Sequence, residues 1–361
     1  MCALFAYRRG YNPRTSVGRR VALKGRALDI FLQQIINGLT LGSVYAIVAL
    51  GYTMVYGIIQ LINFAHGEVV MIGAMVAYTV IVVLTGANTG LPPVVVVLVG
   101  LFAAIPVCMA VGYTLERVAY RPLRRAPRLA PLITAIGLSI ILQHLAMIIW
   151  SRNPLPFPQI VHVESYHVTG NPNGATITNV QIVIIVASVA MMAGLLALVY
   201  RTKLGVAMRA TSQNQQVAGL MGIDINRVIA VTFVIGAGLG AVAGVMVGTY
   251  YGIAQYQMGF LLGLKAFSAA VLGGIGNLAG AMLGGLLLGI IEALGAGYIG
   301  DLTNLCGLSG WSTTIAERCE SDPNLTLFGS NYQDVFAFFV LIAVLIFRPN
   351  GLLGERVGDR A

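Results

Sequence analysis

Long apolar stretches separated by shorter polar ones dominate the pattern of residues along this chain. The apolar runs cover about 30–59, 67–86, 92–114, 129–150, 180–200, 228–250, 264–275, 279–299 and 333–347. A helix that crosses a membrane needs about 20 consecutive apolar residues. The runs therefore predict an all-α polytopic membrane protein with about eight or nine transmembrane helices.

The composition supports this class and excludes several others. Hydrophobic residues make up 57% of the 361 residues and charged residues only 10%, against roughly 45–50% and 25% in ordinary soluble domains. So few charges cannot cover the surface of a protein of this size in water. A cytosolic enzyme, a disordered chain and a nucleic-acid-binding protein are excluded, despite the formal net charge of +9.

The basic residues gather in four short segments of the chain. All Lys and Arg except Arg152, Lys265 and Arg318 lie before residue 30, in 117–128, in 201–227 or after 347. Clusters of this kind between apolar runs mark cytoplasmic loops. With the basic C-terminus in the cytoplasm, the alternation of spans places 115–128 and 201–227 inside and 151–179 and 300–332 outside.

The N-terminal third departs from this rule, because the same alternation places the basic N-terminus outside. Either this tail is an exception, or 30–92 contains an additional crossing or a re-entrant segment; we expect the tail to lie outside. The chain then divides into a basic N-terminal tail (1–29), a transmembrane domain (30–348) and a cytoplasmic C-terminal tail (349–361). The N-terminal tail lacks the apolar stretch of a signal peptide.

Glycines recur at helical spacing within two of the apolar runs. Gly236, Gly240, Gly244 and Gly248 share one helix face, and Gly280, Gly284 and Gly285 repeat the pattern later. Faces of small residues let membrane helices approach closely. We expect these glycines to be packing contacts, and contacts of this kind also permit the sliding that a transporter needs.

Polar residues at membrane depth are the candidates for a transport pathway. Ionisable groups there are costly, so a functional role is the default hypothesis. The candidates are Asn63, His66, Glu68, Lys265 and Glu292. Structural roles compete with this hypothesis: Glu68 can cap and anchor a helix start, Lys265 can reach the outer interface, and Glu292 can form a hydrogen bond between helices.

The chain carries no pattern typical of catalysis. The phosphate-loop pattern G-x-x-x-x-G-K-[ST] is absent, the four His form no metal-ligand array, and the four Cys lack metal-ligand spacing. We therefore expect no catalytic residue, no cofactor and no metal site. Uphill transport would then draw its energy from a partner or from an ion gradient.

The polar segment 201–227 is the most informative part of the sequence. Ser212 is predicted to cap a short helix, with Gln215 completing a capping box and Gly222 ending the helix. Three apolar residues share one face of this helix: Val217, Leu220 and Met221. Because so short a helix is unstable alone, we expect it to bind another protein; folding back on its own membrane domain is the alternative.

Several stretches of the sequence resemble one family of transporters. Gln216-Val-Ala-x-x-x-Gly222 is similar to the E-A-A-x-x-x-G loop of ABC importer permeases, with Gln216 in place of the glutamate. The matching stretches are Phe31-Leu-Gln-Gln-Ile-Ile-Asn-Gly-Leu-Thr-Leu-Gly-Ser, Gly51-Tyr-Thr-Met-Val-Tyr-Gly57, Ile62-Asn-Phe-Ala-His-Gly-Glu68, Glu116-Arg-Val-Ala-Tyr-Arg-Pro122, Arg227-Val-Ile-Ala-Val-Thr-Phe233 and Gly263-Leu-Lys-Ala-Phe-Ser-Ala-Ala-Val-Leu-Gly-Gly-Ile-Gly-Asn277. The chain resembles the LivH-type membrane subunits of branched-chain amino-acid importers over most of its length.

This resemblance implies an ABC importer permease fold in a bacterial inner membrane. It implies three kinds of partner, namely a second permease of the LivM type, two ATP-hydrolysing subunits and a periplasmic substrate-binding protein. The chain itself would not hydrolyse ATP. The resemblance also supports an outer N-terminus and assigns 201–227 to ATPase coupling, through Arg209, Gln216, Val217, Ala218, Leu220, Met221 and Gly222. Since Gln216 replaces a glutamate, no salt bridge is expected there.

One departure from the family is the longer outer loop that contains Cys306 and Cys319. Both Cys lie on the predicted outer face, so we expect a disulfide in an oxidising periplasm. It would close a short loop and stabilise the fold by about 3 kcal/mol in the entropy model.

Alternatives to amino-acid import remain open from the sequence. A urea, short-chain amide or general amino-acid permease is the nearest alternative within the superfamily. An ion-coupled secondary transporter would share the composition and would need a buried carboxylate such as Glu292. A membrane enzyme is disfavoured, because no catalytic constellation is present.

Overall fold

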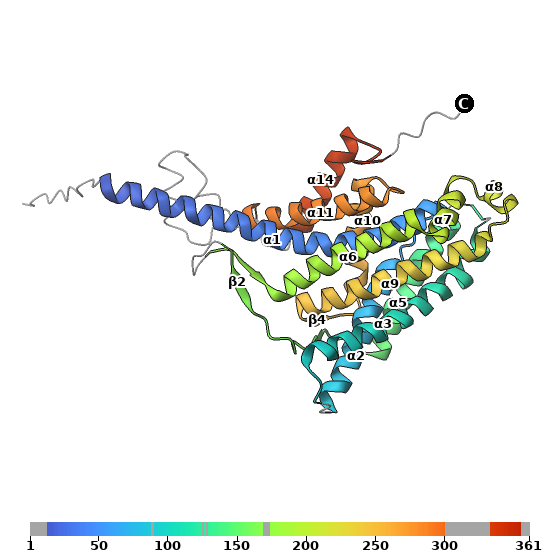
Figure 1. Cartoon of the computed structure of the whole chain (residues 1–361), viewed down its shortest axis with the longest axis horizontal. Coiled ribbons are helices and arrows are strands. Elements are labelled where there is room, and N and C mark those ends of the chain that lie inside the picture. Colours follow the sequence, from blue (N-terminus) through green and yellow to red (C-terminus); the bar gives the residue numbers. More distant parts are fainter. Residues whose placement is uncertain are drawn as a thin grey trace, which may run out of the picture.

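The computed structural model describes residues 13–87, 90–124, 126–127, 129–168, 174–299 and 333–354. Helices account for most of this part of the chain (Figure 1). They are α1 (Pro13–Ile59), α2 (His66–Gly86), α3 (Pro93–Leu115), α4 (Arg121–Leu123), α5 (Leu129–Ile149), α6 (Asn179–Arg201), α7 (Lys203–Gln213), α8 (Gln215–Leu220), α9 (Ile225–Tyr251), α10 (Met258–Gly273), α11 (Leu278–Leu294) and α14 (Gln333–Phe347). The π-helical turns η1 (Glu116–Tyr120) and η2 (Gly295–Ile299) extend α3 and α11.

The strands are short and join the ends of helices. β1 (Leu155–Pro156) pairs antiparallel with β4 (Ile253–Ala254), and β2 (Ser165–His167) pairs antiparallel with β3 (Thr176–Thr178). The first pair ties the segment after α5 to the segment after α9. These strands therefore mark one end of the helix bundle, opposite the end that carries α7 and α8 (Figure 1).

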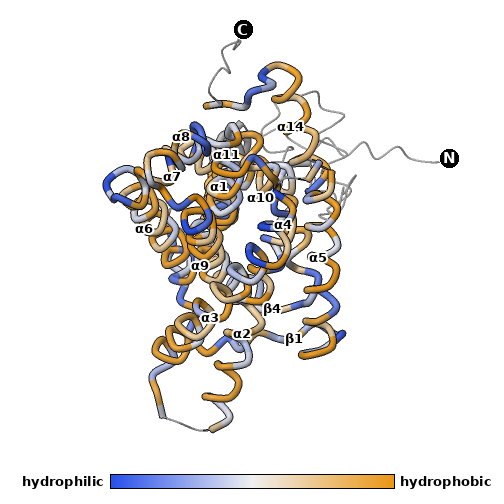
Figure 2. Tube along the Cα trace, turned by 90° about the vertical axis from the view of Figure 1, so that its right-hand side faces the viewer, coloured by the Kyte–Doolittle hydropathy of each residue, from blue (hydrophilic) through white to orange (hydrophobic). Residues whose placement is uncertain are grey.

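The prediction of an all-α polytopic membrane protein is confirmed. Seven helices in the described part are long and apolar enough to cross a membrane, and Met258–Gly273 and Asp334–Phe347 are shorter apolar helices. Together they coincide with the nine predicted runs. Large side chains such as Ile148 (76% exposed) and Phe102 (68% exposed) point away from the bundle, as lipid-facing residues do. In Figure 2, hydrophilic stretches interrupt a mostly hydrophobic tube near α4 and α7.

The helix α1 extends through the centre of the bundle and beyond it. It begins at Pro13, inside the segment expected as a tail, and proline suits a first helical position because its missing N–H has no partner there anyway. Its apolar part starts at Leu28. Near this end Gln33 accepts a hydrogen bond from the backbone of Thr176 in β3 (2.8 Å), and at the other end the carbonyl of Ile58 accepts one from Gln215 in α8 (2.9 Å). The start of α1 and segment 201–227 thus lie at opposite ends of the bundle.

The connection between α1 and α2 is not a simple loop at the end of α1. His66, the first residue of α2, lies against Gly51 of α1 and is buried. Gly51 is eight residues before the end of α1, about 12 Å along its axis. Residues 60–65 therefore fold back alongside α1, and α2 starts inside the bundle rather than at its surface.

The glycine faces pack helix backbones together, as predicted. A Cβ at Gly285 of α11 would lie 2.5 Å from the Cα of Ala46 in α1. Gly244 of α9 lies against the backbone carbonyl of Val70 in α2, and Gly284 lies against that of Ala269 in α10. In lipid, where no hydrophobic effect drives helices together, such close contacts supply the packing energy.

A methyl group at Gly244 tests this packing directly. Gly244→Ala forces α2 and α9 apart, so we expect destabilisation of about 1–3 kcal/mol or more from overpacking. The matched control is Gly194→Ala on α6, where an added Cβ meets no atom within 4 Å. The measurement is thermal unfolding in mild detergent. Equal stability of the two variants would contradict the α2–α9 contact.

Candidate functional site

The short helix α8 projects from the end of the bundle (Figure 1). Asn214 caps it, and its side chain accepts hydrogen bonds from the backbone N–H groups of Gln216 (3.0 Å) and Val217 (3.1 Å). The prediction of Ser212 as the cap is wrong, because Ser212 lies within α7 and its hydroxyl donates to the carbonyl of Arg209. The helix ends before Gly222, whose φ of +83° favours glycine.

The apolar face of α8 points away from the membrane bundle. Leu220 is 87% exposed, Met221 79% and Val217 52%. Ala218, on the opposite face, is buried. Gln216 is exposed. The three apolar side chains therefore form a surface with no covering element in the described part of this chain, which is unfavourable in water and suits a protein contact.

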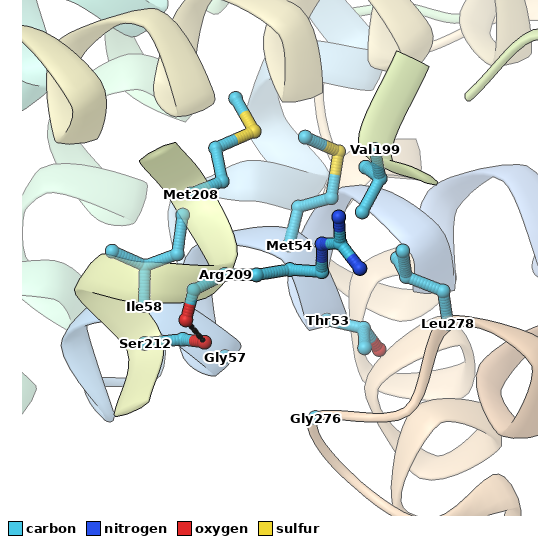
Figure 3. A pocket seen from close by; sticks show the side chains of 10 residues that line it. All are labelled: Thr53, Met54, Gly57, Ile58, Val199, Met208, Arg209, Ser212, Gly276 and Leu278. Atoms are coloured by element: carbon cyan, nitrogen blue, oxygen red, sulfur yellow. Dashed lines mark hydrogen bonds between the residues drawn. The ribbon is translucent and has the colours of Figure 1, made fainter. Parts of the chain in front are cut away.

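A small pocket of about 80 Å³ lies between α1, α7 and the start of α11 (Figure 3). Thr53, Met54 and Ile58 line it from α1, and Met208 and Arg209 line it from α7. The side chain of Arg209 extends across the pocket in Figure 3. Its guanidinium also lies 5.3 Å from the ring centre of Tyr200, within range of a cation–π contact. Arg209 of α7 thus contacts Tyr200 of α6 and also lines the pocket.

A polar cluster surrounds the start of α2 inside the bundle. The carboxylate of Glu68 is fully buried and accepts hydrogen bonds from Ser139 (2.9 Å) and Gln143 (2.8 Å) of α5. Asn63 accepts one from the hydroxyl of Tyr120 (2.9 Å). Glu68 lies in the first turn of α2, as predicted, but it is buried between helices rather than placed at an interface.

Two atoms of this cluster have no hydrogen-bond partner in the described part of the chain. They are Oε2 of Glu68 and Nε2 of His66, and both are buried. His66 contacts the ring of Tyr52 edge-on (4.9 Å between centres), and a Cβ at Gly259 of α10 would lie 2.7 Å from Oε2 of Glu68. Unpartnered polar atoms at this depth are costly, so the cluster is a candidate site for a polar ligand.

A second cluster joins α1, α10, α11 and α14 through charged groups. Lys265 lies 2.7 Å from Oε1 of Glu292 and 2.6 Å from Oδ1 of Asp334. The hydroxyl of Tyr45 donates to Oε2 of Glu292 (3.0 Å). Glu292 therefore forms the predicted hydrogen bond between helices. Lys265 does not extend to the outer interface, because two carboxylates hold its ammonium within the bundle.

Several partners in these sites were not among the candidates predicted from the sequence. Asp334 lies at the start of the last apolar run, and Tyr45, Ser139 and Gln143 are polar residues inside apolar runs. They share one signal in the sequence, because each is a polar residue within an otherwise apolar run. The predicted Cys306 and Cys319 pair lies outside the described residues. Among the described residues, no group of three or more His, Cys, Asp or Glu could hold a metal ion.

The fold and these sites define a class of protein. It is a multi-span helical membrane protein with buried polar groups between its helices and an exposed short helix at one end, as expected of a transport permease.

Comparison with known proteins identifies the family. A family model described as the permease component of the branched-chain amino acid transport system matches residues 34–345. The chain belongs to this family.

Two curated relatives show how extensive the similarity is. The chain is 47% identical over 326 residues to the high-affinity branched-chain amino acid transport system permease protein BraD of Pseudomonas aeruginosa. It is 42% identical over 327 residues to the permease protein LivH of Escherichia coli K12. Each alignment covers 90% of this chain and 96% of the relative. No solved structure matches the chain.

The buried ion pair generates a test of stability. Lys265→Met leaves the buried carboxylate of Glu292 and the partly exposed one of Asp334 without a counter-charge, so we expect a loss of about 3–5 kcal/mol. The triple variant Lys265→Met, Glu292→Gln, Asp334→Asn removes every charge of the cluster and is expected to recover part of that loss. Unfolding by heat or chaotrope in detergent measures both. A single variant as stable as the wild type would contradict the pairing.

Proposed function

We propose that this chain is the membrane-spanning permease subunit of an ATP-driven importer of branched-chain or other hydrophobic amino acids in a bacterial inner membrane. The family match over most of the chain and the close similarity to BraD and LivH support this proposal. In the proposed orientation in the membrane, the end of the bundle with α7 and α8 faces the cytoplasm. The β1–β4 and β2–β3 pairs at the opposite end face the periplasm. The basic loop 201–227 then obeys the positive-inside rule.

The proposed partners are two ATPase subunits, a second permease of the LivM type and a periplasmic binding protein. The observation that carries the ATPase contact is the exposed apolar face of α8. An amphipathic helix with this face fits a hydrophobic groove on a partner protein. The resemblance of Gln216–Gly222 to the E-A-A-x-x-x-G loop supports the proposal that these residues form the contact. The permease itself would hydrolyse no ATP.

We also propose that Asn63, His66 and Glu68 lie on the transport route. An amino acid carries an ammonium and a carboxylate through the membrane, and both groups need polar partners there. Among the described residues, Oε2 of the buried Glu68 carboxylate and Nε2 of the His66 ring have no hydrogen-bond partner. Lys265 and Glu292 already have ionic partners, so a role in holding α10, α11 and α14 together suits them better.

The contact of α8 with the ATPase is tested by adding a charge to its apolar face. Leu220→Asp should weaken docking, so that ATP hydrolysis no longer drives amino-acid uptake in reconstituted vesicles. A buried apolar anchor of this size contributes about 1.5–3 kcal/mol, so uptake should fall at least about tenfold. The control is Gln213→Asp, which adds the same charge at an exposed position of α7. Unchanged coupling in Leu220→Asp would exclude this contact.

The transport route is tested at Glu68. Glu68→Gln preserves the shape but removes the charge, and hydrogen bonds to charged groups contribute about 1.5–3 kcal/mol. We expect uptake to fall by about tenfold or more while the subunits still assemble. Ser139→Ala, which removes only one donor to the carboxylate, should have a smaller effect. Uptake by Glu68→Gln at the wild-type rate, measured with radiolabelled leucine, would remove Glu68 from the route.

A further inference from the structure

A groove of about 350 Å³ lies at the cytoplasmic end of α3 and α9, and the transport proposal gives it no role. Tyr113, Glu116 and Arg121 line one wall, from α3, η1 and α4. Arg227, Val231 and Val234 of α9 line the other wall. The π-helical turn η1 keeps Glu116 buried while Arg121 is exposed at the mouth of the groove.

The groove changes from charged to apolar with depth in the membrane. Arg227 lies in the first turn of α9, and Val231 and Val234 follow four and seven residues later, about 6 and 10 Å deeper along the helix. Arg121 and Tyr113 have the same order on the other wall. The mouth therefore carries guanidinium groups beside the carboxylate of Asp224, and the floor carries an aromatic ring and aliphatic side chains.

Two carboxylates, Glu116 and Asp224, also line the groove, but neither forms an ion pair with Arg121 or Arg227 among the described residues. Glu116 pairs with Arg124, and Arg124 also donates to the side chain of Asn226 (2.8 Å). Asp224 accepts a hydrogen bond from the backbone N–H of Arg227 as the cap of α9. In the described part of the chain, the guanidinium groups of Arg121 and Arg227 have no carboxylate within ion-pair distance.

The side chain of Arg124 is partly buried beside Glu116 and Arg121. Burial lowers the pKa of Arg124, and the neighbouring charge of Arg121 lowers it further, whereas Glu116 raises it. The net shift is downward. Burial is the largest of these causes, and the carboxylate of Glu116 is directed to Arg124 rather than to Arg121.

We propose that this groove binds an anionic phospholipid of the cytoplasmic leaflet, with its phosphate between Arg121 and Arg227 and an acyl chain over Val231 and Val234. A phospholipid carries charge and hydrocarbon in the same order as the two walls do. Basic pockets between membrane helices on the cytoplasmic side suit such headgroups. Free phosphate would leave the apolar floor uncovered. The inference uses the orientation proposed above but not the identity of the transported substrate.

Lipid binding by the purified importer tests this site. Native mass spectrometry in mild detergent would compare phosphatidylglycerol with phosphatidylethanolamine of the same acyl chains. The wild type should prefer phosphatidylglycerol by about tenfold, and Arg121→Gln with Arg227→Gln should lose that preference, since each basic group near the surface contributes to it. The control pair, Arg201→Gln with Lys203→Gln, removes the same charge from exposed positions outside the groove lining.

A second variant keeps the charges and fills the floor of the groove. Val234→Trp should weaken the binding of phosphatidylglycerol, and it decides the question if the arginine variant does not fold. Displacement of the lipid by millimolar inorganic phosphate would assign the site to a soluble anion and overturn the proposal. Wild-type lipid preference in both variants would also overturn the proposal. So would an arginine variant that loses the second permease but still binds the lipid. Since no transport is measured, these results are independent of the importer's substrate.

Discussion

The close approach of the α1 and α11 backbones is the interaction on which the rest of the structure depends. A Cβ at Gly42 would lie 2.8 Å from the Cα of Leu286, and one at Gly285 would lie 2.5 Å from the Cα of Ala46. Only glycine permits this separation, and in lipid the packing it allows replaces the hydrophobic effect. Because the two backbones are this close, Tyr45 of α1 reaches Glu292 of α11.

Features that repeat along the sequence were predictable from it. The nine apolar runs coincide with the long and short apolar helices, because each span must satisfy its own backbone hydrogen bonds and therefore has its own local pattern. The glycine faces on α9 and α11 follow from four-residue spacing. The exposed apolar face of α8 follows from the spacing of Val217, Leu220 and Met221.

Features that depend on distant partners were not predictable. The two carboxylates that hold Lys265 come from other helices, so its own surroundings in the sequence suggested only an interfacial lysine. The inward start of α2 depends on the contact of His66 with Gly51, which no local pattern encodes. Ser212 and Asn214 are both suitable helix caps. Because α7 continues to Gln213, Asn214 is the residue that caps α8.

The hydrogen bond from Gln215 to the carbonyl of Ile58 has a mechanical consequence. It attaches the first residue of α8 to the last turn of α1, at one of the carbonyls that a helix end leaves free. From Ile58 an unbroken helix leads back to Tyr45, about 20 Å away. A displacement of α8 is thus transmitted through the continuous helix α1 to Tyr45, which contacts the buried carboxylate of Glu292.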